Sequence, residues 1–447
     1  MSLQKEIKTF LKVYLFAWVF TFFLFLLNLF NPNISFNQVI EGYWITISSA
    51  SGLVLQHSVV LCFYVIFLVV RYFRRVYRKK GSRVFLKYLV FRFLLPIAIL
   101  FLGLKALIHS NTNEDFAHEW DHSIENQTDS IQDLFETDGK HRGMTVYDLG
   151  RSNRTDIKEL IQNNIEWVVI LPYFYQENEQ TNSIRNTKKV GTWSRRDSSF
   201  IKSIEALHQQ KIRVHLKPHL WMSSGWRSNI NFDNEDDWNT WFESYRKTIL
   251  HYAMMAEKTQ SELFCIGTEL RSSIEHQPQK WMDLIKEIKA IYSGKLTYAA
   301  NWDSDFNRIP FWKELDYIGI QAYFPLTENT NPELSEIQEG WNEHISMLKD
   351  LSMKYQRKII FTEIGYRPDQ AATKKPWEWG SALAPLFKKQ SERTQYLAFE
   401  AMFSQLWNQP WFAGSYIWQW NNSDFEIKNR PAQNSVAKWY SQIGSQE

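Results

Sequence analysis

Eight short β-rich runs alternate with helix-like stretches over roughly the last 300 residues of this 447-residue chain. Each run is almost continuously apolar, as expected for strands that are buried on both faces of a parallel sheet. Eight βα units predict a (β/α)₈ TIM barrel. A doubly wound open sheet is the alternative, but no G-x-G-x-x-G fingerprint follows the first run. The runs are residues 143–148, 167–174, 213–221, 263–270, 296–302, 317–325, 358–366 and 414–420.

The carboxyl ends of the predicted strands carry chemically active side chains. In a (β/α)₈ barrel these ends surround one mouth, where the chemistry takes place. Burying so many polar groups around one opening is costly unless they serve a purpose. The residues are Asp148, Tyr173, His219, Trp221, Glu269, Asn301, Trp302, Tyr323, Glu363, Trp418 and Trp420.

Two glutamates stand out in this ring, Glu269 on the fourth strand and Glu363 on the seventh. A lone glutamate at a strand end is ordinarily an ion-pair partner or a helix cap. Two that converge on one mouth can cleave a glycosidic bond. One carboxyl protonates the leaving oxygen, and the other attacks the anomeric carbon or activates a water, depending on how far apart they lie. This chemistry uses neither a metal nor a cofactor, and we expect none.

The first 109 residues predict a membrane anchor. Residues 13–30 and 52–70 are apolar and uncharged, while the apolar run 84–108 is interrupted by Lys87, Arg92 and Lys105. Runs near 20 residues match the thickness of a bilayer core. We therefore predict three transmembrane helices. A cleaved signal peptide is the alternative, but no small-residue cleavage site follows the first run.

Loop charges predict the orientation of this anchor. Three lysines precede the first run, residues 31–51 contain no Lys or Arg, and seven basic residues lie in 71–83. The positive-inside rule then places residues 71–83 in the cytoplasm and the barrel on the outer side, in the periplasm or outside the cell. Residues 1–110 contain 13 basic and two acidic side chains, against 38 and 46 in the rest. The barrel is thus acidic, and we expect no nucleic acid partner.

Residues 110–142 are polar and rich in acids, so they predict a linker in front of a catalytic domain at 143–447. Within this segment His118, Glu119 and His122 match H-E-x-x-H, the pattern of a zinc metalloprotease helix. The setting argues against that function, because no third ligand follows at a known spacing and the segment is not a buried helix pattern.

Seven segments give the chain a family resemblance. LKPHLW, FCIGTEL, LTYAANW, DYIGIQAYFPL, IIFTEIGYR, PWEW and YIWQW are similar to glycoside hydrolase family 113, a clan A family of β-mannanases. The resemblance covers roughly residues 143–440. It implies a (β/α)₈ barrel and hydrolysis with retention of configuration. A hydrolase of another β-linked glycan and a non-catalytic carbohydrate-binding barrel are the alternatives.

The resemblance also implies roles for individual residues. Glu269 would be the acid/base and Glu363 the nucleophile, with Tyr323 hydrogen-bonded to Glu363. Thr268 departs from the clan, whose members mostly have Asn before the acid/base. The sugar contacts would be His219 and Asn301 through hydrogen bonds, and Trp221, Trp302, Trp418 and Trp420 through stacking.

Several of these residues also have a purely structural interpretation. His219 could be a core histidine, and Trp418 or Trp420 could plug the barrel. Lys217 is interpreted as an internal ion-pair partner of a carboxylate rather than a substrate contact. The two tryptophans of PWEW could line an outer subsite or pin a loop.

Overall fold

The computed structural model describes residues 3–27, 36–152, 154–185, 189–303, 305–380, 384–421 and 424–444. The chain divides into two compact units, Met1–Ala106 and Leu107–Glu447. We describe each unit by itself.

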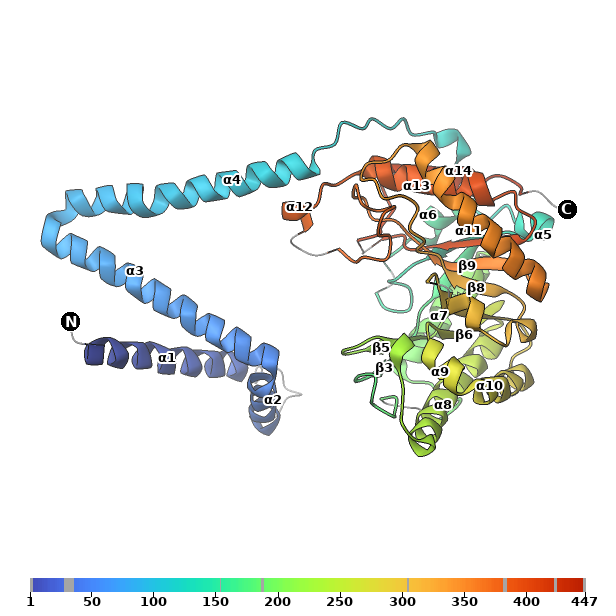
Figure 1. Cartoon of the computed structure of the whole chain (residues 1–447), viewed down its shortest axis with the longest axis horizontal. Helices are drawn as coiled ribbons and strands as arrows, with labels where there is room; N and C mark the ends of the chain where they lie inside the picture. Colours follow the sequence, from blue (N-terminus) through green and yellow to red (C-terminus); the bar gives the residue numbers. More distant parts are fainter. Residues whose placement is uncertain are drawn as a thin grey trace. The chain divides into compact units, whose positions relative to one another are not determined.

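The second unit is a closed barrel of eight parallel strands, wrapped on its outside by helices (Figure 1). Its order β1-β10-β9-β8-β7-β6-β4-β2 places each strand beside its neighbour in the chain, with β10 closing against β1. This confirms the predicted barrel and the eight runs that form it. The strands are β1 (His141–Thr145), β2 (Trp167–Ile170), β4 (Arg213–Leu216), β6 (Leu263–Thr268), β7 (Lys295–Asn301), β8 (Ile318–Gln321), β9 (Ile359–Ile364) and β10 (Phe412–Ile417).

Amphipathic helices cover the barrel, and their apolar faces form the core. On α8, the rings of Trp241 and Tyr245 stack at 4.9 Å, and the Tyr245 hydroxyl donates to the carbonyl of Ile266 in β6. Buried aromatic side chains therefore tie helix to strand at this layer. The main helices are α6 (Ile157–Gln162), α7 (Arg195–Gln209), α8 (Glu235–Thr259), α10 (Pro278–Ile291), α11 (Leu334–Tyr355), α13 (Glu392–Leu406) and α14 (Pro431–Tyr440).

Two predicted strands are each interrupted. The runs 167–174 and 213–221 continue beyond the barrel as a separate parallel pair, β3 (Tyr173–Gln176) and β5 (His219–Met222). Pro172 and Pro218 lie at the two interruptions. Because proline has no N–H to donate, the barrel ladder stops there and the strands pair with each other again beyond it.

The amino-terminal end of the barrel is filled. His141 stacks on Trp167 with ring centroids 4.1 Å apart, and its Nδ1 lies 2.7 Å from the Tyr416 hydroxyl. The imidazole of His215 packs 4.6 Å from the same tyrosine ring. With this end closed by rings, open space in the barrel lies toward the carboxyl ends of the strands.

Part of the segment predicted as a linker contacts the barrel. The Glu114 carboxylate accepts hydrogen bonds from the Ser391 hydroxyl at 2.6 Å and from the Glu392 N–H at 2.6 Å, at the start of α13. Asp138 forms a buried ion pair with Arg142 at 2.7 Å. Two acids of this segment that we expected to be solvated, Glu114 and Asp138, are thus a helix cap and an ion-pair partner, and β1 begins two residues earlier than predicted.

The first unit is helical. The described residues contain two helical stretches that are long and apolar enough to cross a membrane, Glu6–Leu26 and Gly52–Thr112. The second and third predicted spans both fall within the longer stretch. Gly81, with a φ of 78°, is non-helical inside it and marks a kink between two helical segments. The helices are α1 (Leu3–Leu26), α2 (Phe36–Ser48), α3 (Ala50–Leu89) and α4 (Leu95–Thr112), with a π-helical turn, Val90–Leu94, between α3 and α4.

Candidate active site

A cavity of about 350 Å³ opens at the carboxyl end of the barrel. Both glutamates line it, together with Tyr323 and five of the six residues expected to contact the sugar. The structure therefore brings together side chains as far apart in the sequence as Tyr173 and Phe425. The lining residues are Tyr173, His219, Trp221, Trp226, Arg227, Glu269, Asn301, Trp302, Asp303, Gln321, Tyr323, Glu363, Trp377, Trp379, Trp418 and Phe425.

Glu363 lies on β9 and is 5% exposed. The Lys217 ammonium donates to its Oε1 at 2.5 Å, and the Tyr323 hydroxyl donates to its Oε2 at 3.1 Å. Burial, followed by the charge of Glu363, holds the pKa of Tyr323 well above its usual range, so the phenol stays a donor. A lysine and a phenol thus donate to the two oxygens of this carboxyl group, and the ion-pair interpretation of Lys217 is confirmed.

Glu269 follows β6 with a left-handed backbone, at a φ of 53°. Its N–H donates to the Ala299 carbonyl at 2.9 Å, and its carbonyl accepts from the Ser228 hydroxyl at 2.8 Å. A non-glycine residue in this region costs roughly 1–3 kcal/mol, so the surrounding hydrogen bonds must hold it in place. The consequence is a fixed direction for the carboxyl, into the cavity.

The carboxyl of Glu269 has different surroundings from that of Glu363. Its Oε2 lies 2.7 Å from Nη2 of Arg227. Burial raises the pKa of Glu269, Arg227 opposes that shift, and the charge of Glu363 adds to it. The net direction is upward, which favours the protonated form. One cavity therefore holds one carboxyl that favours a proton beside one that is paired as an anion.

His219 and Asn301 supply polar groups at the cavity. Burial, together with the nearby Arg227 and Lys217, holds the pKa of His219 well below its usual range, so its imidazole is neutral. Its Nδ1 is buried and has no hydrogen-bond partner among the described residues. The Asn301 Oδ1 accepts from the Trp302 N–H at 2.9 Å, which orients the amide. Both side chains line the cavity with polar atoms.

Tryptophans form much of the cavity rim. Trp302 and Trp377 stack at 4.7 Å, and Trp379 meets Trp418 edge-on at 6.4 Å. Trp221 is 48% exposed. Both tryptophans of PWEW therefore line the cavity, and this is consistent with the first of their two sequence interpretations.

Trp420 is the expected platform that the structure does not place at the cavity. It is 1% exposed and belongs to the main apolar core. Trp418, two residues earlier, packs in a separate cluster with Phe425 and lines the cavity. Both rings were expected at the mouth of the barrel, but β10 ends at Ile417, before either of them, so strand alternation does not decide which way they face.

Sequence reasoning missed Arg227, the partner of Glu269. It lies in a short 3₁₀ helix, Arg227–Asn229, between β5 and α8. The sequence of this loop has no apolar periodicity from which its position could be predicted. Only in the folded chain does the loop lie at the end of β6. Trp226, Asp303, Gln321 and Phe425 were missed as well.

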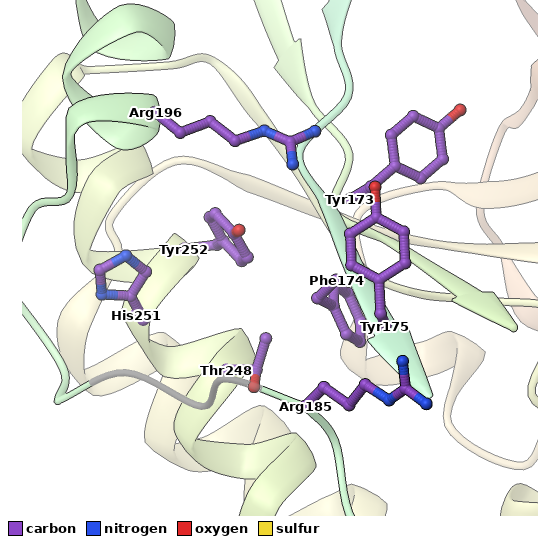
Figure 2. A pocket seen from close by; sticks show the side chains of 8 residues that line it. All are labelled: Tyr173, Phe174, Tyr175, Arg185, Arg196, Thr248, His251 and Tyr252. Carbon is purple, nitrogen blue, oxygen red and sulfur yellow. The ribbon is translucent and has the colours of Figure 1, made fainter. Parts of the chain in front are cut away.

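A second, smaller cavity of about 200 Å³ lies between β3 and the helices α7 and α8 (Figure 2). Figure 2 shows Arg196 and Tyr252 directed toward its interior. Neither glutamate lines this cavity, so the paired carboxyls identify the larger one as the candidate active site. The lining residues are Tyr173, Phe174, Tyr175, Arg185, Arg196, Thr248, His251 and Tyr252.

The H-E-x-x-H match has no zinc-site geometry. Residues 113–121 are not helical, so His118 and His122 do not share a helical face. Nε2 of His118 lies 3.2 Å from Oδ1 of Asn434, and Nδ1 of His122 lies 2.5 Å from Oε1 of Glu125. The two rings contact different partners, which argues against the metalloprotease alternative.

Comparison with known proteins matches this barrel to solved structures. A GH113 β-mannanase from Alicyclobacillus acidocaldarius, solved in complex with ManMIm, has 24% identity and a TM-score of 0.59, covering 68% of this chain and 98% of its own. A GH113 β-1,4-mannanase has 23% identity and a TM-score of 0.57 in a complex structure, covering 67% and 98%. These likenesses support the barrel fold. No curated protein sequence matches the chain.

The family model of Glycoside Hydrolase Family 113 matches residues 144–442. This range contains every strand of the barrel except the first three residues of β1, and it contains all the residues that line the larger cavity. Because the match spans about two thirds of the sequence, the chain belongs to Glycoside Hydrolase Family 113, and its barrel is a glycoside hydrolase.

Proposed function

We propose that the protein hydrolyses β-1,4-mannan-type polysaccharides or oligosaccharides with retention of configuration. The observation that carries this proposal is the contrast between the two buried carboxyls. Glu363 is paired with a cation and a phenol, whereas burial favours a proton on Glu269. Double displacement needs one carboxylate and one carboxylic acid in one cavity.

Glu363 is the nucleophile in this proposal. Its ionised carboxylate attacks the anomeric carbon while Glu269 donates its proton to the leaving glycosidic oxygen. In the second step Glu269, now ionised, takes a proton from water, and that water attacks the same carbon and releases Glu363. Lys217 and Tyr323 donate to Glu363 whenever it is ionised.

The rim supplies the glycan contacts. Trp221, Trp302 and Trp418 present ring surfaces on which the C–H faces of sugars can stack, and His219 and Asn301 hydrogen-bond sugar hydroxyls. The mannan assignment draws on the family and on the activity named for the two solved β-mannanases. Trp420 has no part in these contacts because it lies in the core.

We further propose that residues 1–109 anchor the enzyme in the cytoplasmic membrane through three helices, with the barrel on the outer side. The two long apolar stretches support an anchor. The break at Gly81 supports counting the longer stretch as two spans, because Phe73 packs across it against Phe85 at 5.9 Å and Phe93 at 5.6 Å. The basic residues 71–83 surround this break.

The nucleophile is tested by Glu363→Ala. Turnover of β-mannan should disappear, and added azide should restore part of the rate with an activated aryl glycoside, giving the glycosyl azide of inverted configuration. Glu205→Ala is the matched control, since Glu205 is exposed on α7 and does not line the cavity. An undiminished rate in Glu363→Ala would remove Glu363 from this role.

The acid is tested by Glu269→Ala. Substrates with activated leaving groups should lose much less rate than β-mannan, because only the natural leaving group requires protonation. An equal loss on both would contradict the assignment. Proton NMR of the first product formed by the unaltered enzyme should show the β-anomer, and an α-anomer would contradict retention.

The glycan is tested by product analysis on a panel of β-linked polysaccharides. Hydrolysis of mannan and glucomannan in preference to β-glucans is expected. Preferential cleavage of another β-linked glycan would overturn the mannan assignment alone. Binding without turnover of any member would instead support the non-catalytic alternative.

A further inference from the structure

The residues that follow the last apolar run are tied to one particular loop of the barrel unit. The Asn111 amide donates to the Pro385 carbonyl at 3.0 Å, and the Gln390 N–H donates to the Asn111 carbonyl at 2.7 Å. Glu114 then accepts from the N–H of Glu392 at the start of α13. All these residues belong to the second unit. The chain between Asn111 and Glu114 is therefore fixed against residues 385–392.

This loop differs from the rest of the barrel unit in charge and exposure. We define the aromatic–basic loop as the described residues 374–380 and 384–390. It contains four lysines and one glutamate, although residues 111–447 as a whole carry 46 acids against 38 basic residues. Phe387 is 78% exposed and Trp379 is 59% exposed. A basic surface with protruding rings thus lies on an acidic domain.

The exposed rings are carried by a loop that is held in place. The Arg367 guanidinium donates to the Glu378 carbonyl, and the Gly380 N–H donates to the Asp424 carboxylate at 2.9 Å. The Glu378 carboxylate pairs with Lys388 at 2.7 Å. These contacts link the described parts of the loop to each other and to the barrel. Phe387 is therefore presented outward by a fixed support.

We propose that the aromatic–basic loop docks on the outer surface of the lipid bilayer. This inference rests on the proposed membrane anchor. Asn111 is three residues beyond Ile108, the last residue of the apolar run, which is about 4.5 Å of helix rise. Because Asn111 contacts Pro385 and Gln390 directly, the loop is held within a few residues of the proposed end of the last span. Aromatic rings and lysines are the side chains that suit this interfacial region.

Docking has a consequence for the substrate. Trp377 and Trp379 belong to the aromatic–basic loop and also line the catalytic cavity. If the loop rests on the lipid head groups, one side of the cavity rim lies at the membrane surface. The glycan that reaches the two carboxyls is then one that lies on this surface or is attached to it.

The docking is tested with the full-length protein in vesicles of phosphatidylcholine and phosphatidylglycerol. Phe387→Cys is labelled with an environment-sensitive fluorophore in a Cys62→Ser background, where Cys265 is buried. Met353→Cys on α11 is the matched control, because Met353 is 58% exposed and lies outside the loop. We expect blue-shifted emission and quenching by spin-labelled lipid at position 387, and neither effect at position 353.

The outcomes separate docking from the other proposals. Equal emission and equal quenching at positions 387 and 353, in protein that alkaline carbonate does not extract, would overturn docking and leave the anchor intact. Extraction by carbonate would overturn both. Hydrolysis of soluble mannan is measured on the same samples and reports on the proposed activity alone. Lys389→Cys, on an exposed side chain of the loop, repeats the test independently of Phe387.

Discussion

Glu269 and Glu363 are both about 95% buried, so exposure does not distinguish them. Their neighbours do. Lys217 and Tyr323 place two donors on Glu363, whereas Glu269 has Arg227 on one oxygen and a desolvated setting that raises its pKa. The difference between the proposed nucleophile and the proposed acid therefore depends on side chains that the sequence separates from them by 40 to 146 residues.

Tyr323→Phe should lower kcat/KM on β-mannan roughly tenfold to a hundredfold, because it removes one hydrogen bond to an ionised group, worth about 1.5–3 kcal/mol. The ring stays, so the packing against Phe425 at 6.1 Å is kept. Steady-state kinetics measure the change, and circular dichroism checks the fold. Tyr355→Phe on α11 is the matched control. An unchanged kcat/KM would show that Glu363 does not depend on this donor.

Arg227→Met should move the alkaline limb of the kcat/KM profile to higher pH. The limb reports loss of the proton from Glu269 in the free enzyme. Arg227 stabilises the ionised form and so lowers the pKa of Glu269, and its removal leaves burial and Glu363 to raise that pKa further. Arg246→Met, at an arginine of α8 paired with Glu287, is the control and should leave the limb in place. A shift to lower pH would contradict the proposed electrostatics.

At the scale of elements, sequence periodicity was sufficient for the barrel and insufficient for its connections. All eight runs became barrel strands because a strand buried on both faces must be apolar along its length. The splits at Pro172 and Pro218 were readable from missing N–H donors, but pairing of β3 with β5 depends on where both strands leave the barrel. Arg227 was missed and Trp420 was expected at the mouth of the barrel, because side chains outside the barrel strands do not follow the periodicity of a strand.

The contacts of residues 110–142, which precede β1, could not be predicted from the sequence either. The acids of this segment have a solvated composition, yet the Glu114 carboxylate binds the N-terminal end of α13. Composition reports the average tendency of a segment, and cannot report that one glutamate meets a helix N-terminus nearly 280 residues later. Capping of this kind satisfies N–H groups that the helix itself leaves unpaired.

Glu114→Ala should lower the free energy of unfolding of the barrel unit by about 1–2 kcal/mol, since it removes a charged cap. Thermal unfolding of the full-length protein in detergent, followed by near-UV circular dichroism, measures the loss. Glu119→Ala, at an exposed glutamate of the same segment, should change little. Equal stability of the two variants would indicate that residues 110–142 act as the linker that their composition predicts.

At the scale of the whole molecule, two kinds of sequence divide the chain. Basic and apolar residues are concentrated before residue 110, and the acidic family domain follows. The proposed anchor would limit where the enzyme can act, because a barrel joined to a bilayer samples only glycans near that surface. Docking of the aromatic–basic loop would restrict the accessible glycans further, because one side of the cavity rim would then lie at the membrane surface.

Which glycans the enzyme can reach depends on the side of the membrane on which the barrel lies. The positive-inside rule predicts that residues 71–83 are cytoplasmic and the barrel is outside. In a Cys62→Ser background, a membrane-impermeant maleimide should label Met353→Cys on spheroplasts without permeabilisation, since Met353 is exposed on α11. Arg78→Cys, in the basic segment, should be labelled only after detergent is added. Labelling in the opposite order would place the catalytic cavity in the cytoplasm, where glycans on the outer surface cannot reach it.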